Sequence, residues 1–497
     1  MKRKILNFVR IVAFLLVVFV CLFGASVLVK RKDSDYKYKP FFEQAKKGNI
    51  DVLFMGSSHV INGINPVKLY KDYGYTSYNM GGHGSVMQAT YWELMEALEY
   101  CTPKWVVVDT YMLEKNYQYL DEMDETADES LRNTSVEQLH LNMDVWPLDK
   151  LKVTAIEDLI ADKDIRNQFL FDFIVYHDRW NELTDNDYRA LKGQQDETYL
   201  LGAEMRKEVD YSPVFSADPS EGEELSEWTV GQEYLTKILE ECEAREIGVL
   251  LINLPYCATT EDKIAANSAG ILANMYDVPY INMLNMDIIN IYSDLNDAGH
   301  LNVSGANKVT ASIGKWLMEN GDLTDHRGNA DYVYFDECVE KYVQQIPQDI
   351  QDVQDLYSEL SVASLDDVSC VVYFNQGSQA LKDDNIKRLV EGITGTDKIY
   401  QVNEPYICIK DSASGNIYEA GDGEMIENAA TAMGNLTYQP VEAMFRFLYV
   451  DDNLDDNYLY DDEHLAYDIQ IITYDKDTGE VLSHKYYRSF GNKYRAD

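Results

Sequence analysis

The sequence predicts an α/β protein with a three-layer parallel sheet, preceded by a membrane helix and followed by a smaller β-rich domain. Three observations predict it. Residues 11–29 carry no charge, strand-like and helix-like runs alternate from residue 51 to about 320, and residues beyond 361 show mainly strand patterns. A chain of 497 residues is too long for one ordinary core, so we expect two or three domains.

The first element is the apolar run Ile11–Val29. As a helix it would span roughly 28 Å, about the thickness of a hydrocarbon core. Apolar residues continue past the small residues 24–26, which favours an uncleaved anchor at residues 1–32 over a cleaved signal peptide. Basic residues flank both ends of the run, so charge alone does not set its orientation.

An α/β domain is predicted at residues 33–325, beginning with a short polar connection at Lys37–Asn49. Its predicted strands are Asp51–Met55, Ser77–Met80, Trp105–Asp109, Gly248–Asn253 and Pro279–Met283. Its predicted helices are Pro66–Asp72, Ser85–Tyr100, Gly231–Arg245, Asp262–Tyr276 and Val303–Glu319. Such alternation is typical of a parallel sheet with helices on both faces. A helical insertion at about 114–230, acidic at its start, is predicted to be a cap over a site or a decoration.

Two further regions follow the α/β domain. Residues 326–360 are predicted to form a helical bridge with one helix at Gln348–Leu360. Residues 361–497 are predicted to form a β-rich accessory domain that ends in a hairpin around Asp477–Gly479.

Composition excludes several functions. The 43 basic and 85 acidic residues give a net charge of −42, which argues against a nucleic-acid partner. None of the seven cysteines forms a Cys-x-x-Cys pair, which argues against a zinc ribbon. The segment 475–479 lacks calcium-loop spacing, and the acidic stretch 451–464 is expected to be a solvated loop. His59 and His83 have no carboxylate or cysteine at ligand spacing, so we expect no metal and no cofactor.

Three polar segments follow three of the predicted strands. They are Gly56-Ser57-Ser58-His59, Gly81-Gly82-His83-Gly84 and Asp297-Ala298-Gly299-His300. Ligands of open parallel sheets bind beyond the carboxyl ends of the strands, so these loops should converge. A serine hydroxyl needs a base to take its proton, and a histidine needs a carboxylate to hold its tautomer. The sequence therefore predicts Ser58 as nucleophile with His300 and Asp297, and the N–H groups of Ser58 and Gly84 as oxyanion donors.

These motifs resemble the SGNH/GDSL hydrolase superfamily, over roughly residues 50 to 320. The segment 56–59 matches the first block, "NMGGHG" at 79–84 the second, and "DAGH" at 297–300 the last. The resemblance implies a flavodoxin-like sheet, Ser58 as nucleophile and Gly84 as an oxyanion donor. The third block normally supplies an asparagine, whereas "WVVVDTYMLE" places Asp109 and Thr110 there. Thr110 or a residue of the cap would have to replace it.

The anchor and "LFMGSSH" resemble membrane-attached bacterial proteins of this superfamily such as DltD and the alginate O-acetylation proteins. "YHDRWNEL" also resembles a segment of that group, in which His177 and Arg179 would either contact substrate or belong to an ordered cap helix. The resemblance implies an extracytoplasmic acyltransferase or esterase in a bacterial membrane. It would move an acyl group, most simply acetyl, to a cell-surface polysaccharide or teichoic acid beside a membrane-bound O-acyltransferase. A glycan deacetylase, or a catalytically weak polymer-binding partner, is the alternative.

Overall fold

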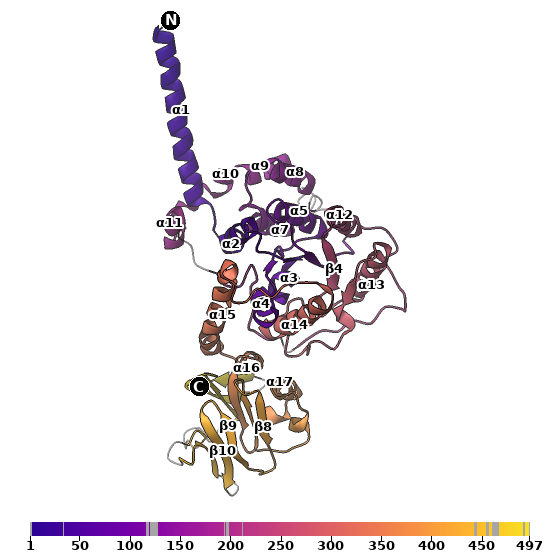
Figure 1. Cartoon of the computed structure of the whole chain (residues 1–497), viewed down its shortest axis with the longest axis vertical. Coiled ribbons are helices and arrows are strands. Elements are labelled where there is room, and N and C mark those ends of the chain that lie inside the picture. The colour runs from indigo at the N-terminus through magenta and orange to yellow at the C-terminus, as the bar shows by residue number, and fades with distance from the viewer. Residues whose placement is uncertain are drawn as a thin grey trace.

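The computed structural model describes residues 2–32, 34–115, 119, 128–192, 194, 198–210, 212–441, 445–453, 457–459, 467–490 and 493–496. Helix α1 (Lys2–Val29) projects from one end of an α/β domain, and the C-terminal sheets lie at the opposite end of the molecule (Figure 1). The predicted fold class, an α/β sheet with an apolar N-terminal helix and a β-rich C-terminal region, is confirmed.

The α/β domain is built on a five-stranded parallel sheet with the order β2-β1-β3-β4-β5. The strands are β1 (Val52–Met55), β2 (Ser77–Asn79), β3 (Trp105–Asp109), β4 (Gly248–Asn253) and β5 (Tyr280–Asn282). The chain adds β2 on one side of β1 and then β3, β4 and β5 on the other side, so the strand order reverses between β1 and β3. The carboxyl end of β1 therefore lies at the switch point where such sheets bind ligands. The sheet therefore places Ser58, three residues after β1, at that edge.

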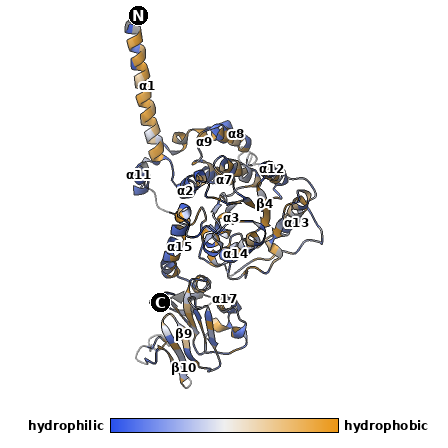
Figure 2. Ribbon diagram, viewed as in Figure 1, coloured by the Kyte–Doolittle hydropathy of each residue, from blue (hydrophilic) through white to orange (hydrophobic). Residues whose placement is uncertain are grey.

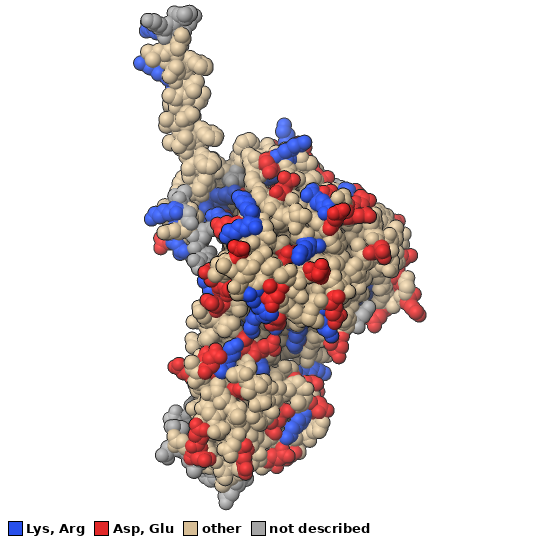
Figure 3. Space-filling view, in the orientation of Figure 1, with Lys and Arg blue, Asp and Glu red and all other residues tan. Residues whose placement is uncertain are grey.

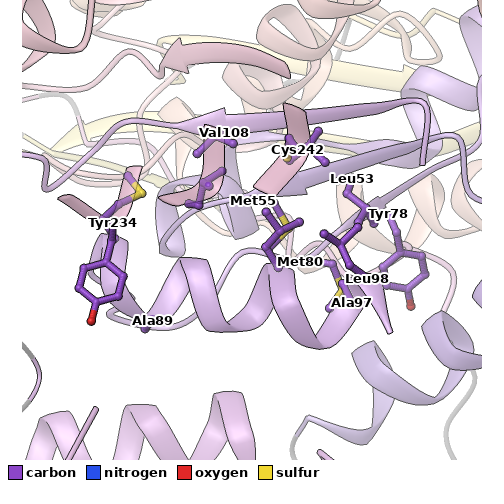
Figure 4. Close-up of a cluster of buried hydrophobic side chains, with 14 of the residues drawn as sticks. Leu53, Met55, Tyr78, Met80, Ala89, Ala97, Leu98, Val108, Tyr234 and Cys242 are labelled. Atoms are coloured by element: carbon purple, nitrogen blue, oxygen red, sulfur yellow. The ribbon is translucent and has the colours of Figure 1, made fainter. Parts of the chain in front are cut away.

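Helices cover both faces of this sheet. On one face lie α3 (Ser58–Gly63), α4 (Pro66–Tyr73) and α14 (Val303–Asn320). On the other lie α5 (Met87–Leu98), α12 (Val230–Ala244) and α13 (Thr260–Met275). Figure 4 shows Leu53, Met55 and Val108 of the sheet packed against α5 and α12. Alternate residues of each strand point to opposite faces, so β1 contributes to both cores.

Helix α2 (Asp35–Lys46) replaces the polar connection predicted at Lys37–Asn49, which was wrong. Tyr38, Phe41 and Ala45 recur at helical spacing and are buried in the same core as the sheet. Pro40 lies inside the helix and conceals this periodicity in the sequence.

The insertion is helical between residues 129 and 191, whereas its described residues between 198 and 229 form no helix or strand. Its helices are α7 (Glu129–Met143), α8 (Lys150–Leu159), α9 (Lys163–Leu170), α10 (Asp172–Tyr176), the 3-10 turn η1 (Arg179–Asn181) and α11 (Asp185–Leu191). The acidic start of the insertion, apart from residues 119 and 128–130, lies outside the described residues.

The bridge contains two helices, α15 (Val333–Asp352) and α16 (Leu356–Ala363), and the single helix predicted at Gln348–Leu360 was wrong. Val353 adopts an extended conformation, and the Asp355 side chain accepts a hydrogen bond from the Ser358 N–H and so caps α16. The extended Val353 therefore ends α15, and the Asp355 cap begins α16, within the run predicted as one helix.

The C-terminal region has two sheets. A six-stranded sheet has the order β14-β13-β12-β6-β7-β8 and a three-stranded one the order β11-β10-β9. Helix α17 (Asp384–Thr394) packs on the first sheet. The strands are β6 (Ser369–Phe374), β7 (Tyr406–Asp411), β8 (Asn416–Ala420), β9 (Ile426–Thr431), β10 (Gly434–Val441), β11 (Phe445–Val450), β12 (Ile469–Tyr474), β13 (Val481–Phe490) and β14 (Lys493–Ala496). The hairpin predicted around Asp477–Gly479 is confirmed between β12 and β13. Of the acidic stretch 451–464, residues 454–456 and 460–464 lie outside the described residues.

Helix α1 is long and apolar enough to cross a membrane. The candidate span, Ile5–Val29, has a mean hydropathy of 3.0 (Figure 2). No other part of the described chain covers its apolar window.

We expect Phe41→Ala to lower the free energy of unfolding by about 3–5 kcal/mol, because the Phe41 side chain is fully buried against Tyr78. Phe215→Ala is the matched control, since Phe215 is 60% exposed, and should change that free energy by about 0.5 kcal/mol. Denaturant titration of both variants measures the difference. Equal stability of the two would show that α2 is not part of the core.

Candidate active site

The turn between β1 and α3 places the Ser58 side chain at the edge of the sheet. Gly56 has φ +151°, and a Cβ atom there would lie 2.6 Å from Cγ2 of Val60, so only glycine fits. The Ser57 hydroxyl accepts the His59 N–H at 3.2 Å and caps the helix. Ser58 is therefore the first helical residue, where the N–H has no partner within the helix.

The glycine-rich loop after β2 packs directly on this turn. The Gly82 N–H donates to the carbonyl of Gly56 at 2.8 Å, and a Cβ atom on Gly81 would lie 2.7 Å from the Ser57 carbonyl. Behind the loop, the Lys37 ammonium donates to the Gly81 carbonyl and pairs with Glu93 at 3.3 Å. Burial lowers the pKa of Lys37, although Glu93 opposes the shift. The loop is thus held by glycine packing and by a buried cation.

The last motif forms a tight turn just before α14. Oδ1 of Asp297 accepts the N–H groups of Gly299 at 2.9 Å and His300 at 3.0 Å, and the Asn296 N–H donates to the His300 carbonyl at 2.8 Å. Aspartate commonly bonds the backbone two or three residues ahead in this way. The turn brings the carboxylate beside the imidazole of the same motif.

The structure brings Ser58, His300 and Asp297 into one chain of hydrogen bonds. The Ser58 Oγ lies 2.9 Å from Nε2 of His300, and Nδ1 of His300 lies 2.9 and 3.1 Å from the two Asp297 oxygens. A carboxylate accepts the Nδ1 proton, which leaves Nε2 of the neutral ring as an acceptor for the serine proton. This arrangement can activate a hydroxyl as a nucleophile.

Asp297 stays ionised in this setting. Burial raises the pKa of its carboxyl, but hydrogen bonds from the Gly299 amide, His300 and Asn296 outweigh burial and bring the pKa below its ordinary value. Arg206 adds an ion pair, with its Nη1 3.5 Å from Oδ2 of Asp297. The carboxylate is therefore available as an anion to the imidazole.

Gly84 lies in the glycine-rich loop with φ +57°. Among the described residues, the N–H groups of Ser58 and Gly84 have no hydrogen-bond partner. The neighbouring N–H groups of the loop donate elsewhere: that of Gly81 to Asn79, that of Gly82 to Gly56, that of His83 to Asn142 and that of Ser85 to Gly82. Of these loop donors, the Gly84 N–H is the one left for a ligand in the described part of the chain.

Thr110 does not fit the substrate contact expected of it. It is 1% exposed, its hydroxyl donates to the Ile252 carbonyl at 3.1 Å and it accepts from Asn253 at 3.2 Å. Its proton is therefore used within the protein. The preceding carboxyl, Asp109, is also buried, and accepts the Leu254 N–H at 3.2 Å.

His177 and Arg179 lie beside helix α1, and the structure gives neither a contact with the triad. Arg179 donates to the carbonyl of Val29 at the end of α1 and pairs with Asp187 at 3.6 Å, while the exposed His177 bonds the Ile174 carbonyl at 3.0 Å. A cation at a helix C-terminus is stabilised by the helix dipole. These contacts agree with the second alternative, an ordered part of the insertion, and they place Arg179 at the end of α1.

An aromatic wall beside the triad was missed from the sequence. The His59 ring stacks on the Tyr111 ring, with their centroids 3.7 Å apart. It meets the Tyr256 ring edge-on at a centroid distance of 4.7 Å, and its centroid lies 5.5 Å from that of the His300 ring. Burial lowers the pKa of His59 to about 3, so its ring is neutral near pH 7. Its position directly after Ser58 was a signal, but its partners come from other strands.

A second missed feature is the segment 199–210, which runs past α3. The Glu204 N–H donates to the Ile61 carbonyl at 3.0 Å, and the Val303 N–H donates to the Arg206 carbonyl at 2.7 Å. The segment brings the Glu204 carboxylate within 3.5 Å of Nε2 of His83. The segment thus adds the carboxylate of Glu204 and the guanidinium of Arg206 to the rim of the site.

No protein-family model and no curated protein matches the sequence. Solved structures that match include a protein from Bacteroides fragilis provisionally described as an acylhydrolase and a GDSL-like lipase from Bacteroides thetaiotaomicron. Each is 13% identical with a TM-score of 0.27, and the matches cover 56% and 57% of this chain and 95% and 98% of those chains. A TM-score this low does not establish a shared family.

We expect Asp109 to make stability depend on pH. Burial raises the pKa of this carboxyl to about 7, although hydrogen bonds from Leu254, Tyr111 and Thr110 oppose the shift. Between about pH 4 and pH 7 the unfolded chain therefore loses a proton that the folded chain keeps, and stability falls as pH rises. Asp109→Asn removes this dependence.

The measurement is the unfolding free energy of wild type minus that of Asp109→Asn at pH 5 and pH 8. We expect the difference to fall by about 1–4 kcal/mol between the two. A difference that stays constant would mean that the carboxyl is ionised in the folded protein.

Proposed function

We propose that this protein is a membrane-anchored serine acyltransferase or esterase of the SGNH type. The observation that carries the proposal is the continuous hydrogen-bonded chain from Ser58 through His300 to Asp297. Each residue comes from the loop position that the sequence motifs predict, at the carboxyl edge of the sheet. Partial exposure of the Ser58 side chain supports access by a substrate.

The chemistry would proceed in two steps. The Ser58 oxygen attacks the carbonyl carbon of an acyl ester while Nε2 of His300 takes the hydroxyl proton. The tetrahedral adduct collapses, the proton passes to the departing alcohol, and the acyl group stays on Ser58. An acceptor hydroxyl or water then attacks the acyl-serine, again giving its proton to His300, and serine is regenerated. Asp297 holds the imidazole and stabilises the imidazolium in both steps.

The negative oxygen of each adduct needs preorganised donors. We assign this role to the N–H groups of Ser58 and Gly84, because both are unpartnered among the described residues. Thr110 supplies no third donor, since its proton goes to Ile252. That shortage supports the alternative of a weak catalyst whose main role is to bind polymer.

We further propose that α1 anchors the protein in a bacterial membrane with the remaining chain outside the cytoplasm, and that residues 361–497 form an accessory domain. The apolar, uncovered span of α1 supports the anchor. The acceptor would be a hydroxyl of a cell-surface polysaccharide or teichoic acid. A membrane-bound O-acyltransferase would supply the acyl group.

A fluorophosphonate probe tests the nucleophile. We expect it to label the wild-type chain and not Ser58→Ala. Ser57→Ala is the matched control, because the neighbouring hydroxyl caps α3 and does not reach His300. Labelling that survives Ser58→Ala would exclude Ser58 as the nucleophile.

The same assignment predicts non-additive kinetics. His300→Ala should lower hydrolysis of an activated acetyl ester by at least about 10³-fold, and Ser58→Ala in that background should cost little more, since the residues act as a unit. Asp297→Asn should cost about 10²–10⁴-fold. His83→Ala serves as the control, because His83 pairs with Glu204 and not with Asp297.

Product analysis decides between the directions of transfer. With an acetyl donor and an acceptor oligosaccharide, a transferase should divert acetyl from water to the sugar, and mass spectrometry reads the added group. Acetylated glycan that loses acetyl, with no acceptor ever gaining it, would identify a deacetylase. No turnover in either assay, together with retained glycan binding, would identify the polymer-binding alternative.

A further inference from the structure

The last turns of α1 pack against the insertion. Residues Ile5–Gly24 are exposed except Val18, whereas Ala25–Val29 are partly or fully covered. The covering elements are α10 and α11, which both contact α1 and lie on either side of its base (Figure 1). The α10–α11 region is therefore fixed at one height along the helix.

That height corresponds to the surface of a bilayer. The uncovered residues Ile5–Gly24 span about 30 Å at 1.5 Å per residue, which is about the thickness of a hydrocarbon core. If the hydrocarbon core of the bilayer instead begins after Arg10, Ala25–Val29 lie inside it, at the edge nearer to α10. In both cases α10 lies beside the boundary between acyl chains and headgroups.

Three large apolar side chains are exposed at this level. Phe171 is 58% exposed, Ile174 51% and Trp180 49%, and all lie within the stretch 171–180 that contains α10. We call these three residues the α10 patch. Aromatic residues, tryptophan above all, concentrate at membrane–water interfaces, where an apolar ring is stabilised by the acyl chains.

The charge around the α10 patch also suits a lipid surface. Segments 30–32 and 170–192 together carry six basic and five acidic residues, in a chain whose net charge is −42. Figure 3 shows basic side chains gathered at the base of α1. Most of the surface would be repelled by anionic lipid, but this region would not be.

We infer that the α10 patch inserts into the lipid headgroup–acyl boundary and holds the α/β domain against the membrane. The inference rests on the proposed anchoring of α1 and adds a second contact with the same bilayer. A single helix would leave the domain free to tilt, whereas two contacts fix its orientation. The C-terminal sheets would then project away from the membrane (Figure 1).

Site-directed fluorescence on the full chain in liposomes tests the inference. Ile174→Cys, in a Cys21→Ser background, is labelled with nitrobenzoxadiazole, and quenching by doxyl-labelled lipid in phosphatidylcholine–phosphatidylglycerol vesicles is measured. Ile271→Cys is the matched control, an isoleucine on helix α13 that is 42% exposed. Five of the remaining cysteines are buried, and the Cys21→Ser parent gives the background labelling of Cys257.

We expect lipid quenching at position 174 to exceed that at position 271 by at least about twofold. Equal quenching at the two positions would overturn the inference. A label at position 174 that is shielded from water in native membranes, but not in liposomes that contain no other protein, would also overturn the inference and would point to a protein partner. The exposed Cys21, labelled in the otherwise unchanged chain, separates the two proposals, because a label there that escapes quenching shows that α1 itself is not in the bilayer.

Discussion

The contact on which the site depends is the packing of the glycine-rich loop against the first turn of α3. Gly81 and Gly56 leave no room for a side chain, and the Gly82 N–H closes the contact at 2.8 Å. A Cβ atom at either glycine would push the turn away from the sheet. Since Ser58 and His300 are joined by one hydrogen bond of 2.9 Å, a small displacement would break the chain of hydrogen bonds from Ser58 to Asp297.

The sequence predicted the parts of the molecule that are determined locally. Three of the five parallel strands, β1, β3 and β4, are short apolar runs that end at glycine or polar residues, and the predicted bounds of all five agree with the structure to within one residue. Ser58 could be found because it follows β1 closely, and Asp297 and His300 because of their Asp-x-x-His spacing just before α14. By contrast, β9 and β10 carry few apolar residues, and their pairing with β11 depends on partners distant in the sequence.

The residues that sequence reasoning missed act through contacts with distant segments. Glu204 and Arg206 reach the site because the backbone of their segment bonds to Ile61 and Val303. The residue spacing of segment 199–210 does not predict that its backbone bonds to these two residues. His177 and Arg179 show the converse, since Arg179, which could have contacted substrate, bonds instead to the end of helix α1.

Helix α7 connects the end of α1 to the glycine-rich loop. The Asn142 side chain accepts the His83 N–H at 2.8 Å and donates to the His83 carbonyl at 2.9 Å. At the same end of α7, the carbonyl of the adjacent Leu141 accepts the Ser34 hydroxyl at 2.5 Å, and the carbonyl of Asp144, just after the helix, accepts the Lys30 ammonium. The connection after α1 is therefore bonded to the helix that holds the glycine-rich loop. A flexible linker would let the site move freely relative to α1, whereas this packing fixes its distance from the end of that helix.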